Sequence, residues 1–132
     1  MGLIRGVAHV SFKTADMDRA VAFYCGVLGM KDYKDIDRPD GSKWLKFIEI
    51  APGQYLEMLY RDDGDYLEGM YSHLCLEVED LDALVARLKE HKISLEKEPQ
   101  VGVTGNYSCW AKDPDGNRIE FAQIPADSPF RG

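Results

Sequence analysis

The second half of this chain repeats the first at a nearly constant offset. His9 and Glu57 of the first half recur as His73 and Glu120 of the second, and the His-to-Glu separation is almost the same in both halves. A repeat of this length restricts the fold to two copies of one supersecondary unit. Two imidazoles and two carboxylates are also a suitable ligand set for a divalent metal. We therefore predict one metal site to which both copies contribute.

The first half has the pattern of a β-α-β-β-β unit within residues 1–61. Apolar and polar residues alternate over 7–12, which predicts a strand. An apolar stripe follows between Asp16, a good N-cap, and Gly29, which suits a left-handed C-cap. Further strands are expected at 33–37, 44–50 and 54–60, separated by Pro- and Gly-containing turns.

The same order recurs within residues 71–126. A strand is predicted at 72–78, followed by a helix from Asp80 to about Lys89 and by strands at 95–97, 107–112 and 118–124. The polar segment 62–70 between the halves is expected to be a solvated linker rather than a cation site. The predicted fold class is α+β, a single domain of two repeated units whose curved mixed sheets enclose a metal cavity.

Strand alternation places the four candidate ligands on equivalent faces. In the strand 72–78 the apolar residues fall on one face, while His73 and Cys75 fall on the other. Glu57 lies opposite its apolar neighbours in the same way, and so does Glu120. If the apolar faces pack on the helices, all four candidate ligands point away from the helices. A lone histidine or glutamate in a strand is usually structural or solvated. Four such residues that all lie on the face opposite the apolar residues favour a metal site.

Composition narrows the possible partners and the compartment. A chain of 132 residues with 45% hydrophobic residues can form one ordinary core. The net charge of −7 argues against nucleic-acid and anionic-membrane surfaces, which leaves small molecules as the favoured partners. No stretch reaches the roughly 18 apolar residues of a membrane helix. Three widely spaced cysteines predict reduced thiols and a cytoplasmic protein.

Several motifs together resemble the vicinal oxygen chelate superfamily, which includes glyoxalases, bleomycin-binding proteins and extradiol dioxygenases. They cover nearly the whole chain. The motifs are His9-Val-Ser-Phe, Asp16-Met-Asp-Arg-Ala-Val-Ala-Phe-Tyr, Val27-Leu-Gly-Met30, Leu56-Glu-Met-Leu-Tyr60, Tyr71-Ser-His-Leu-Cys-Leu-Glu-Val-Glu-Asp80 and Lys112-Asp-Pro-Asp-Gly-Asn-Arg-Ile-Glu-Phe121.

Within this superfamily the set His9, Glu57, His73 and Glu120 is most similar to that of the bacterial glyoxalase I group. The resemblance implies a divalent metal, namely nickel, zinc, cobalt or manganese, and a homodimer with ligands shared between subunits. It implies conversion of the hemithioacetal of methylglyoxal and a thiol to a hydroxyacyl thioester through a metal-bound enediolate, and thus methylglyoxal detoxification. Glu120 is then the expected base, with Glu57 as a possible second base.

Two positions depart from the glyoxalase I pattern. Lys13 stands where an arginine is usual, and Arg61 stands where an asparagine is usual, at positions that help bind the glutathione carboxylate. Both are candidate substrate-binding residues for an anionic thiol adduct, and ordinary surface charges are an equal alternative. Other functions remain open, namely an epimerase, a dioxygenase or a non-catalytic drug-binding protein. Methylmalonyl-CoA epimerases usually have glutamine in place of Glu57.

Three further predictions concern single residues. A small buried thiol is the favoured interpretation of Cys75. Trp110 could line a pocket, but core packing is the commoner role for such residues. His91 is expected at a helix end, close to the terminal carbonyl groups.

Overall fold

The computed structural model describes residues 2–3, 7–61 and 71–129. The chain divides into two compact units, Met1–Glu68 and Gly69–Gly132. The predicted linker, 62–70, lies outside the described residues. That the two units form a single domain stays a prediction, and each unit is described here by itself.

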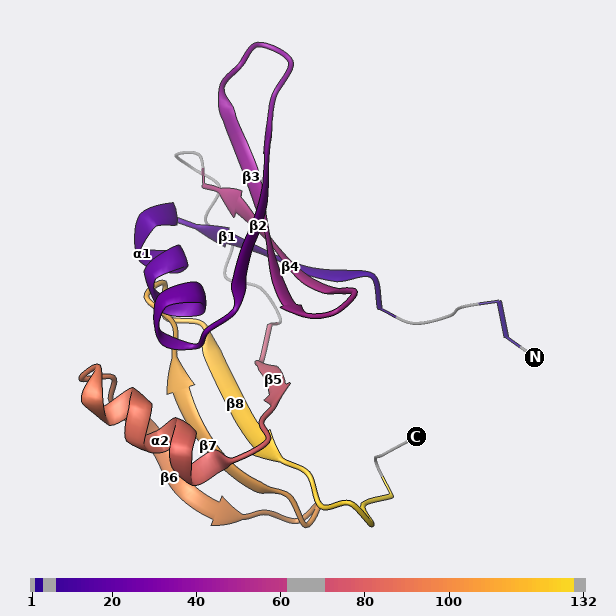
Figure 1. The fold of residues 1–132 in the computed structure, drawn as a ribbon, viewed down its shortest axis with the longest axis vertical. Helices are drawn as coiled ribbons and strands as arrows, with labels where there is room; N and C mark the ends of the chain where they lie inside the picture. The colour runs from indigo at the N-terminus through magenta and orange to yellow at the C-terminus, as the bar shows by residue number, and fades with distance from the viewer. Residues whose placement is uncertain (1, 4–6, 62–70, 130–132) are drawn as a thin grey trace. The chain divides into compact units, whose positions relative to one another are not determined.

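Unit 1 contains one four-stranded sheet and one helical segment (Figure 1). In the sheet order β1-β4-β3-β2, β1 runs parallel to β4, and the other neighbours are antiparallel. The elements are β1 (His9–Thr14), α1 (Met17–Val21), the π-helical segment η1 (Ala22–Val27), β2 (Lys31–Asp37), β3 (Lys43–Ala51) and β4 (Gln54–Tyr60).

Unit 2 repeats this arrangement in the order β5-β8-β7-β6, again with one parallel pair, β5 and β8. Helix α2 lies along one face of the sheet (Figure 1) and contacts β7 and β8. The elements are β5 (Leu74–Glu77), α2 (Leu81–Glu90), β6 (Leu95–Val101), β7 (Tyr107–Lys112) and β8 (Arg118–Gln123). The identical strand order confirms the predicted α+β fold of two β-α-β-β-β units.

The predicted helix caps are confirmed in both units. The Asp16 carboxylate accepts a hydrogen bond from the backbone N–H of Arg19 at 3.1 Å, and Asp80 accepts one from Ala83 at the same distance. These carboxylates satisfy donors that the first helical turn leaves without intrahelical partners. Gly29 has the left-handed conformation predicted for it, with φ of 77°.

Several strands differ from their predicted bounds by one or two residues at an end, and two elements differ more clearly. The helix of unit 1 changes to π-helical geometry after Val21, and no sequence pattern predicts this change. Strand β6 continues to Val101, beyond the predicted end at Lys97. It does so because β6 is an edge strand, and Pro99 falls in the irregular stretch between Lys97 and Gln100 where pairing to β7 is interrupted.

The buried face of each sheet supplies most of the core. In unit 1 the core includes Ile48, Leu56 and Met58 from the sheet and Ala20 and Tyr24 from the helical segment, all with 0% exposure. Burying such a large apolar side chain contributes about 1.5–3 kcal/mol. The fully buried residues of unit 2 are Leu81, Leu88, Cys109, Ala111, Ile119 and Ala122.

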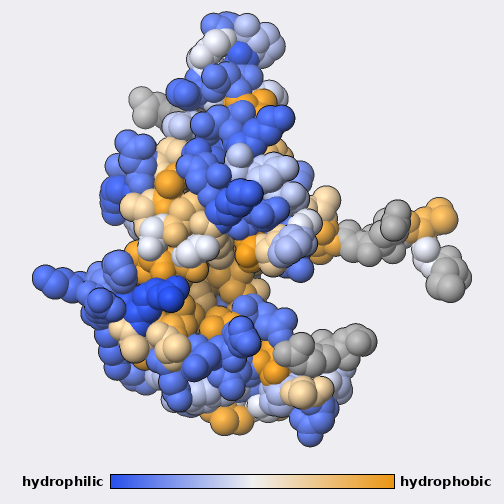
Figure 2. All heavy atoms as spheres, in the orientation of Figure 1, coloured by the Kyte–Doolittle hydropathy of each residue, from blue (hydrophilic) through white to orange (hydrophobic). Residues whose placement is uncertain are grey.

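One charged residue interrupts the buried face of unit 1. Lys46 on β3 is 8% exposed, and its Nζ lies 2.6 Å from Asp32 Oδ1 and 2.9 Å from Asp35 Oδ1 on β2. The matching position on β7 of unit 2 is held by Cys109, which is fully buried. Figure 2 shows mainly hydrophilic residues over the outer part of the β2–β3 hairpin. The ion pairs thus join the two strands of this hairpin, β2 and β3.

Candidate metal centre

His9 and Glu57 meet on neighbouring parallel strands of unit 1. His9 opens β1, and Glu57 lies in the middle of β4, directly across from Ser11 in the β1–β4 register. His9 Nε2 is 3.5 Å from Glu57 Oε2. The histidine side chain is 41% exposed and the carboxylate side chain 18% exposed, so both remain within reach of solvent.

His73 and Glu120 form the matching pair in unit 2. His73 lies just before the first residue of β5, whereas the predicted strand 72–78 included it. Glu120 lies on β8. His73 Nε2 is 3.5 Å from Glu120 Oε1, the same separation as in unit 1. Ser72 Oγ and His73 Nδ1 lie within hydrogen-bond distance at 2.9 Å. The other ring nitrogen of His73 is therefore engaged, and Nε2 is the nitrogen that faces the carboxylate.

The predicted alternation of strand faces is confirmed in both units. Leu56 and Met58, on either side of Glu57, are fully buried, and Ile119 and Phe121 beside Glu120 are at most 1% exposed. Because successive side chains of a strand point to opposite faces, each glutamate lies on the face opposite the core.

Each histidine packs against an aromatic ring from the third strand of its sheet. The rings of His9 and Phe47 have centroids 5.7 Å apart, and those of His73 and Trp110 have centroids 4.5 Å apart, both in edge-to-face geometry. Core packing is thus the wrong interpretation of Trp110. Phe47 did not stand out from sequence reasoning, although it precedes Glu57 by the same interval at which Trp110 precedes Glu120.

The second aromatic ring also carries two cations. The Arg118 guanidinium lies 4.7 Å from the centroid of the Trp110 ring, and Lys97 Nζ lies 5.4 Å from it. Arg118 Nε also donates to Glu96 at 3.1 Å. These contacts limit the rotation of the indole that packs on His73, since cations over an aromatic face are attracted to it.

Each carboxylate also has a small polar side chain beside it. Ser11 Oγ donates a hydrogen bond to Glu57 Oε1 at 3.0 Å. Cys75 lies across from Glu120 in the β5–β8 register and is an exposed residue, so the prediction of a buried thiol is wrong. Partial desolvation of its sulfur, the charge of Glu120 and a hydrogen bond with Glu120 raise the pKa of Cys75 to about 11. Ser11 and Cys75 occupy equivalent positions, since each is the second residue after the histidine of its unit.

The donor atoms of each pair suit a divalent ion. Nitrogen and oxygen ligands lie about 2.0–2.2 Å from zinc, so atoms 3.5 Å apart can contact the same ion. Imidazole and carboxylate are also donors that several first-row divalent metals accept. Among the described residues, no group of three or more His, Cys, Asp or Glu side chains gathers as a possible metal cluster. Each unit thus brings together two of the four predicted ligands.

The remaining candidate residues lie outside the two pairs. Lys13 is exposed on β1. It lies two residues after Ser11 and four after His9, so all three side chains lie on the same face of the sheet. Arg61 is exposed and follows β4 directly, where its backbone N–H donates to the carbonyl of Thr14 at 2.9 Å.

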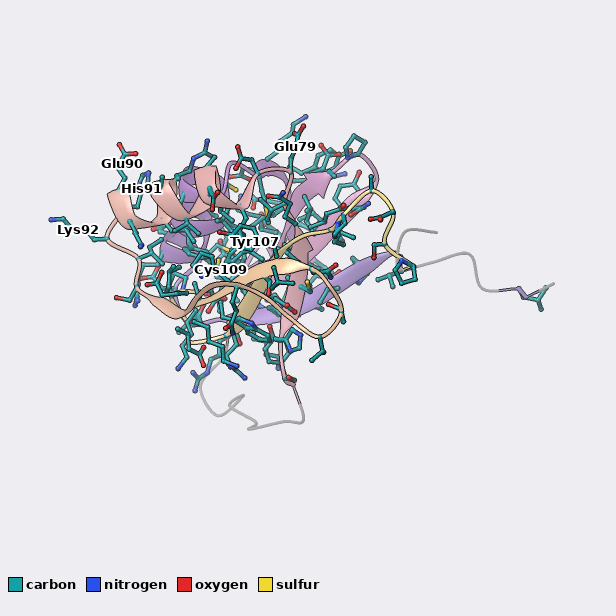
Figure 3. The ribbon with its side chains drawn as sticks, turned by 90° about the horizontal axis from the view of Figure 1, so that it is seen from below. Glu79, Glu90, His91, Lys92, Tyr107 and Cys109 are labelled. Carbon is teal, nitrogen blue, oxygen red and sulfur yellow. The ribbon has the colours of Figure 1, made fainter. Side chains whose placement is uncertain are left out.

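The third histidine of the chain lies at the end of a helix, as predicted. His91 is the C-cap of α2, and its backbone N–H donates to the carbonyl groups of Arg87 and Lys89. Figure 3 shows His91 at the opposite end of α2 from Glu79. His91 therefore belongs to the helix terminus rather than to a His–Glu pair.

Two sheets with the same strand order, each with a His–Glu pair on its polar face, define a class of proteins built from paired β-α-β-β-β units. The chain belongs to the Glyoxalase/Bleomycin resistance protein/Dioxygenase superfamily, whose sequence pattern matches residues 6–121. This membership confirms the resemblance found from the motifs.

Individual relatives within the superfamily carry different activities in their names. A probable lactoylglutathione lyase of Synechocystis sp. is 27% identical, with 87% of this chain and 92% of the relative covered. Human mitochondrial methylmalonyl-CoA epimerase is 29% identical, with 87% of this chain and 72% of the relative covered. The crystal structure of an antibiotic-binding protein from Streptomyces sp. CB03234 has a TM-score of 0.76 at 24% identity, covering 93% of this chain and 98% of that protein.

Within the described part of the chain, no helix has the length and apolar character needed to cross a membrane.

Proposed function

We propose that this protein is a metal-dependent lyase or isomerase of the glyoxalase I type. It converts the hemithioacetal of methylglyoxal and a thiol to a hydroxyacyl thioester. The observation that carries the proposal is the His–Glu pair on the polar sheet face of each repeated unit. The relatives named lactoylglutathione lyase support the same reaction class.

In this proposal, His9, Glu57, His73 and Glu120 together hold one divalent ion, which is nickel, zinc, cobalt or manganese. The bound ion supplies Lewis-acid stabilisation of the negative charge that develops on the substrate oxygens. The protein contributes partly desolvated carboxylates, with Glu57 and Glu120 side chains 18% and 22% exposed. Electrostatic interactions are stronger in such surroundings than in bulk water.

Glu120 acts as the general base. It takes the proton from the carbon that bears the sulfur and hydroxyl groups, and it returns that proton to the neighbouring carbon. The hydroxyl proton passes to the oxygen of the neighbouring carbon, so the reaction is an isomerisation with no net gain or loss of atoms. A carboxylate within reach of both carbons is sufficient for this transfer. Glu57 is the candidate for a second base. Glu120→Gln, which keeps the shape of the side chain, should therefore reduce kcat about 100-fold or more.

Lys13 and Arg61 bind the anionic part of the thiol adduct. Both side chains are cationic and exposed, and Lys13 lies on the strand face that carries His9. Neutral Lys13→Gln and Arg61→Gln variants should raise KM and leave kcat within about threefold, because they remove binding that is equal in the ground and transition states. An unchanged KM in both variants would show that Lys13 and Arg61 are ordinary surface charges.

The protein acts as a homodimer in the cytoplasm, with His9 and Glu57 of one subunit sharing the ion with His73 and Glu120 of the other. Three free cysteines suit a reducing compartment. Mixing His9→Ala chains with Glu120→Ala chains tests the shared site, since one of the two sites in each mixed dimer would be intact. Mixed dimers without recovered activity would contradict the shared arrangement.

Metal analysis combined with turnover tests the proposal as a whole. The purified protein is stripped with a chelator and reconstituted with each of the four metals. Bound metal is then quantified, and turnover of methylglyoxal with glutathione is measured. We expect one ion per four-ligand set and turnover that depends on it. A protein that binds metal without turnover would retain the site and exclude the reaction, and a protein that binds no metal would exclude both.

An epimerase is the second candidate, because human methylmalonyl-CoA epimerase is among the relatives. Glu57 argues against it, since those enzymes usually have glutamine there. The same metal-loaded protein, incubated with methylmalonyl-CoA in deuterated water, would incorporate deuterium at the α-carbon only if it is an epimerase. The antibiotic-binding structural neighbour shares the fold and supplies no argument for the activity of this chain.

A further inference from the structure

The two carboxylates of the candidate metal centre are held by different donors. Ser11 Oγ donates to Glu57 Oε1 at 3.0 Å, while Oε2 of the same carboxylate faces His9 Nε2 at 3.5 Å. One oxygen of Glu57 is thus fixed by the neighbouring strand, and the other is turned toward the histidine. The serine occupies this position because parallel β1–β4 pairing sets Ser11 directly across from Glu57.

Unit 2 has a thiol in the equivalent position. Cys75 lies directly across from Glu120 in the β5–β8 pair, as Ser11 does from Glu57 in the β1–β4 pair. A thiol is a weaker hydrogen-bond donor than a hydroxyl group. The repeat therefore preserves the place of the donor and changes its strength.

We propose that Ser11 and Cys75 are positioning residues that hold the two carboxylates unequally. Ser11 fixes Glu57 as a permanent ligand, which argues against a role for Glu57 as second base. The weaker donor Cys75 leaves Glu120 free to move between the ion and the substrate. The inference rests on the proposed function, and it assigns different roles to the two glutamates of the same site. A ligand that must also carry a proton needs this freedom, whereas a purely structural ligand gains from being held in place.

Nickel binding to the full-length protein tests the first half of this proposal. Stripped protein is titrated with Ni²⁺ in competition with a chromophoric chelator. Ser11→Ala should weaken Ni²⁺ binding about tenfold, in line with the loss of a group that orients a metal ligand. Ser11→Thr, which restores a hydroxyl group, should bring the affinity back to within about threefold. Ser42→Ala is the matched control, because Ser42 lies in the β2–β3 turn and bonds Asp40 instead.

The variants of Cys75 test the second half. Cys75→Ala should change the Ni²⁺ affinity by less than about threefold. Cys75→Ser supplies a stronger donor and should lower kcat with methylglyoxal and glutathione several-fold, while KM and metal affinity do not fall. A variant that was merely unstable would lose metal binding as well, which separates positioning from folding.

Three results would overturn the proposal. The first is Ser11→Ala binding Ni²⁺ as tightly as the wild type, and the second is Cys75→Ala losing as much affinity as Ser11→Ala. The third is Cys75→Ser with unchanged kcat. If the wild type binds Ni²⁺ and turns over, these results reject the unequal hold and leave the proposed function intact. A wild type without metal binding rejects both together.

Discussion

Removing the buried ammonium of Lys46 should destabilise the protein less than removing the carboxylates that neutralise it. The Lys46 side chain is 10% exposed, whereas those of Asp32 and Asp35 are 47% and 52% exposed. In Lys46→Met the aspartates regain water, and the methionine fills the apolar space. In the Asp32→Ala, Asp35→Ala double variant a nearly buried ammonium loses both partners, which is the costlier loss.

The magnitudes follow from the two hydrogen bonds of Lys46. Each charge-assisted hydrogen bond contributes about 1.5–3 kcal/mol to the free energy of unfolding. In Lys46→Met, burial of the methionine side chain offsets about 1.5–3 kcal/mol of the loss of the two bonds. We expect Lys46→Met to lower the free energy of unfolding by about 1–2 kcal/mol and the double aspartate variant to lower it by about 3 kcal/mol. With a urea m-value of about 1.5 kcal/mol per M, the midpoints shift by about 1 M and 2 M.

The pH dependence of this effect has a definite sign. Burial lowers the pKa of Lys46, but hydrogen bonds and charge attraction with Asp32 and Asp35 outweigh burial and raise it above the ordinary 10.5. A group with a raised folded-state pKa stabilises fully below its unfolded pKa and stops doing so as pH rises through the folded value. The difference between wild type and Lys46→Met should therefore be constant from pH 7 to about 9.5 and shrink above about 10.5.

Urea unfolding in a Trp110→Phe background provides the assay. Trp44 on β3, close to Lys46 in the sequence, then reports on unit 1 by its emission, and far-UV circular dichroism follows the whole chain. The reasoning is refuted if Lys46→Met costs as much as the double aspartate variant. A difference between wild type and Lys46→Met that persists unchanged above pH 11 would also contradict it.

Three other predictions concern local features. Asp16→Ala and Asp80→Ala should each cost about 1 kcal/mol in urea unfolding by exposing helix N–H groups, and asparagine at either position should restore most of it. Gly53→Ala should cost about 1 kcal/mol because the residue has φ of 77° with open space around its α-carbon, whereas Gly102→Ala, also in open space but without positive φ, should be nearly neutral. Burial and the charge of Glu98 raise the pKa of Cys109 to about 11, so native protein at pH 8 should resist alkylation there, as read by peptide mass spectrometry, until urea is added.

Features that rest on local periodicity were predictable from the sequence. The order of strands and helices follows from alternation and from the capping aspartates, which act within one helical turn. The pairing of His9 with Glu57 followed from repeat spacing and strand faces, because side-chain period fixes which residues share a face. The same logic brought His73 and Glu120 together.

Features that rest on strand register or on tertiary compensation do not follow from the periodicity of a single strand. Phe47 reaches His9 only because β3 pairs with β4 in one particular register, in which Phe47 stands across from Glu57. Lys46 is a charged residue on the buried face of β3, and the two aspartates on β2 make its burial tolerable. Cys75 follows the alternation, but its partner Glu120 comes from β8, much later in the chain. The nearly constant offset between the two halves would have identified Phe47 from Trp110, and Ser11 in the same way from Cys75.

The charges along β2 have a further consequence for the behaviour of the protein at high concentration. β2 is one of the two edge strands of its sheet, and five of its seven residues, from Lys31 to Asp37, are charged. An edge strand with unpaired backbone groups invites strand addition from other chains, and charged side chains oppose that addition. In unit 2 the edge strand β6 combines charges with Pro99, which lacks an N–H group. Both sheets thus carry, at the edge farthest from the His–Glu pairs, a built-in protection against aggregation.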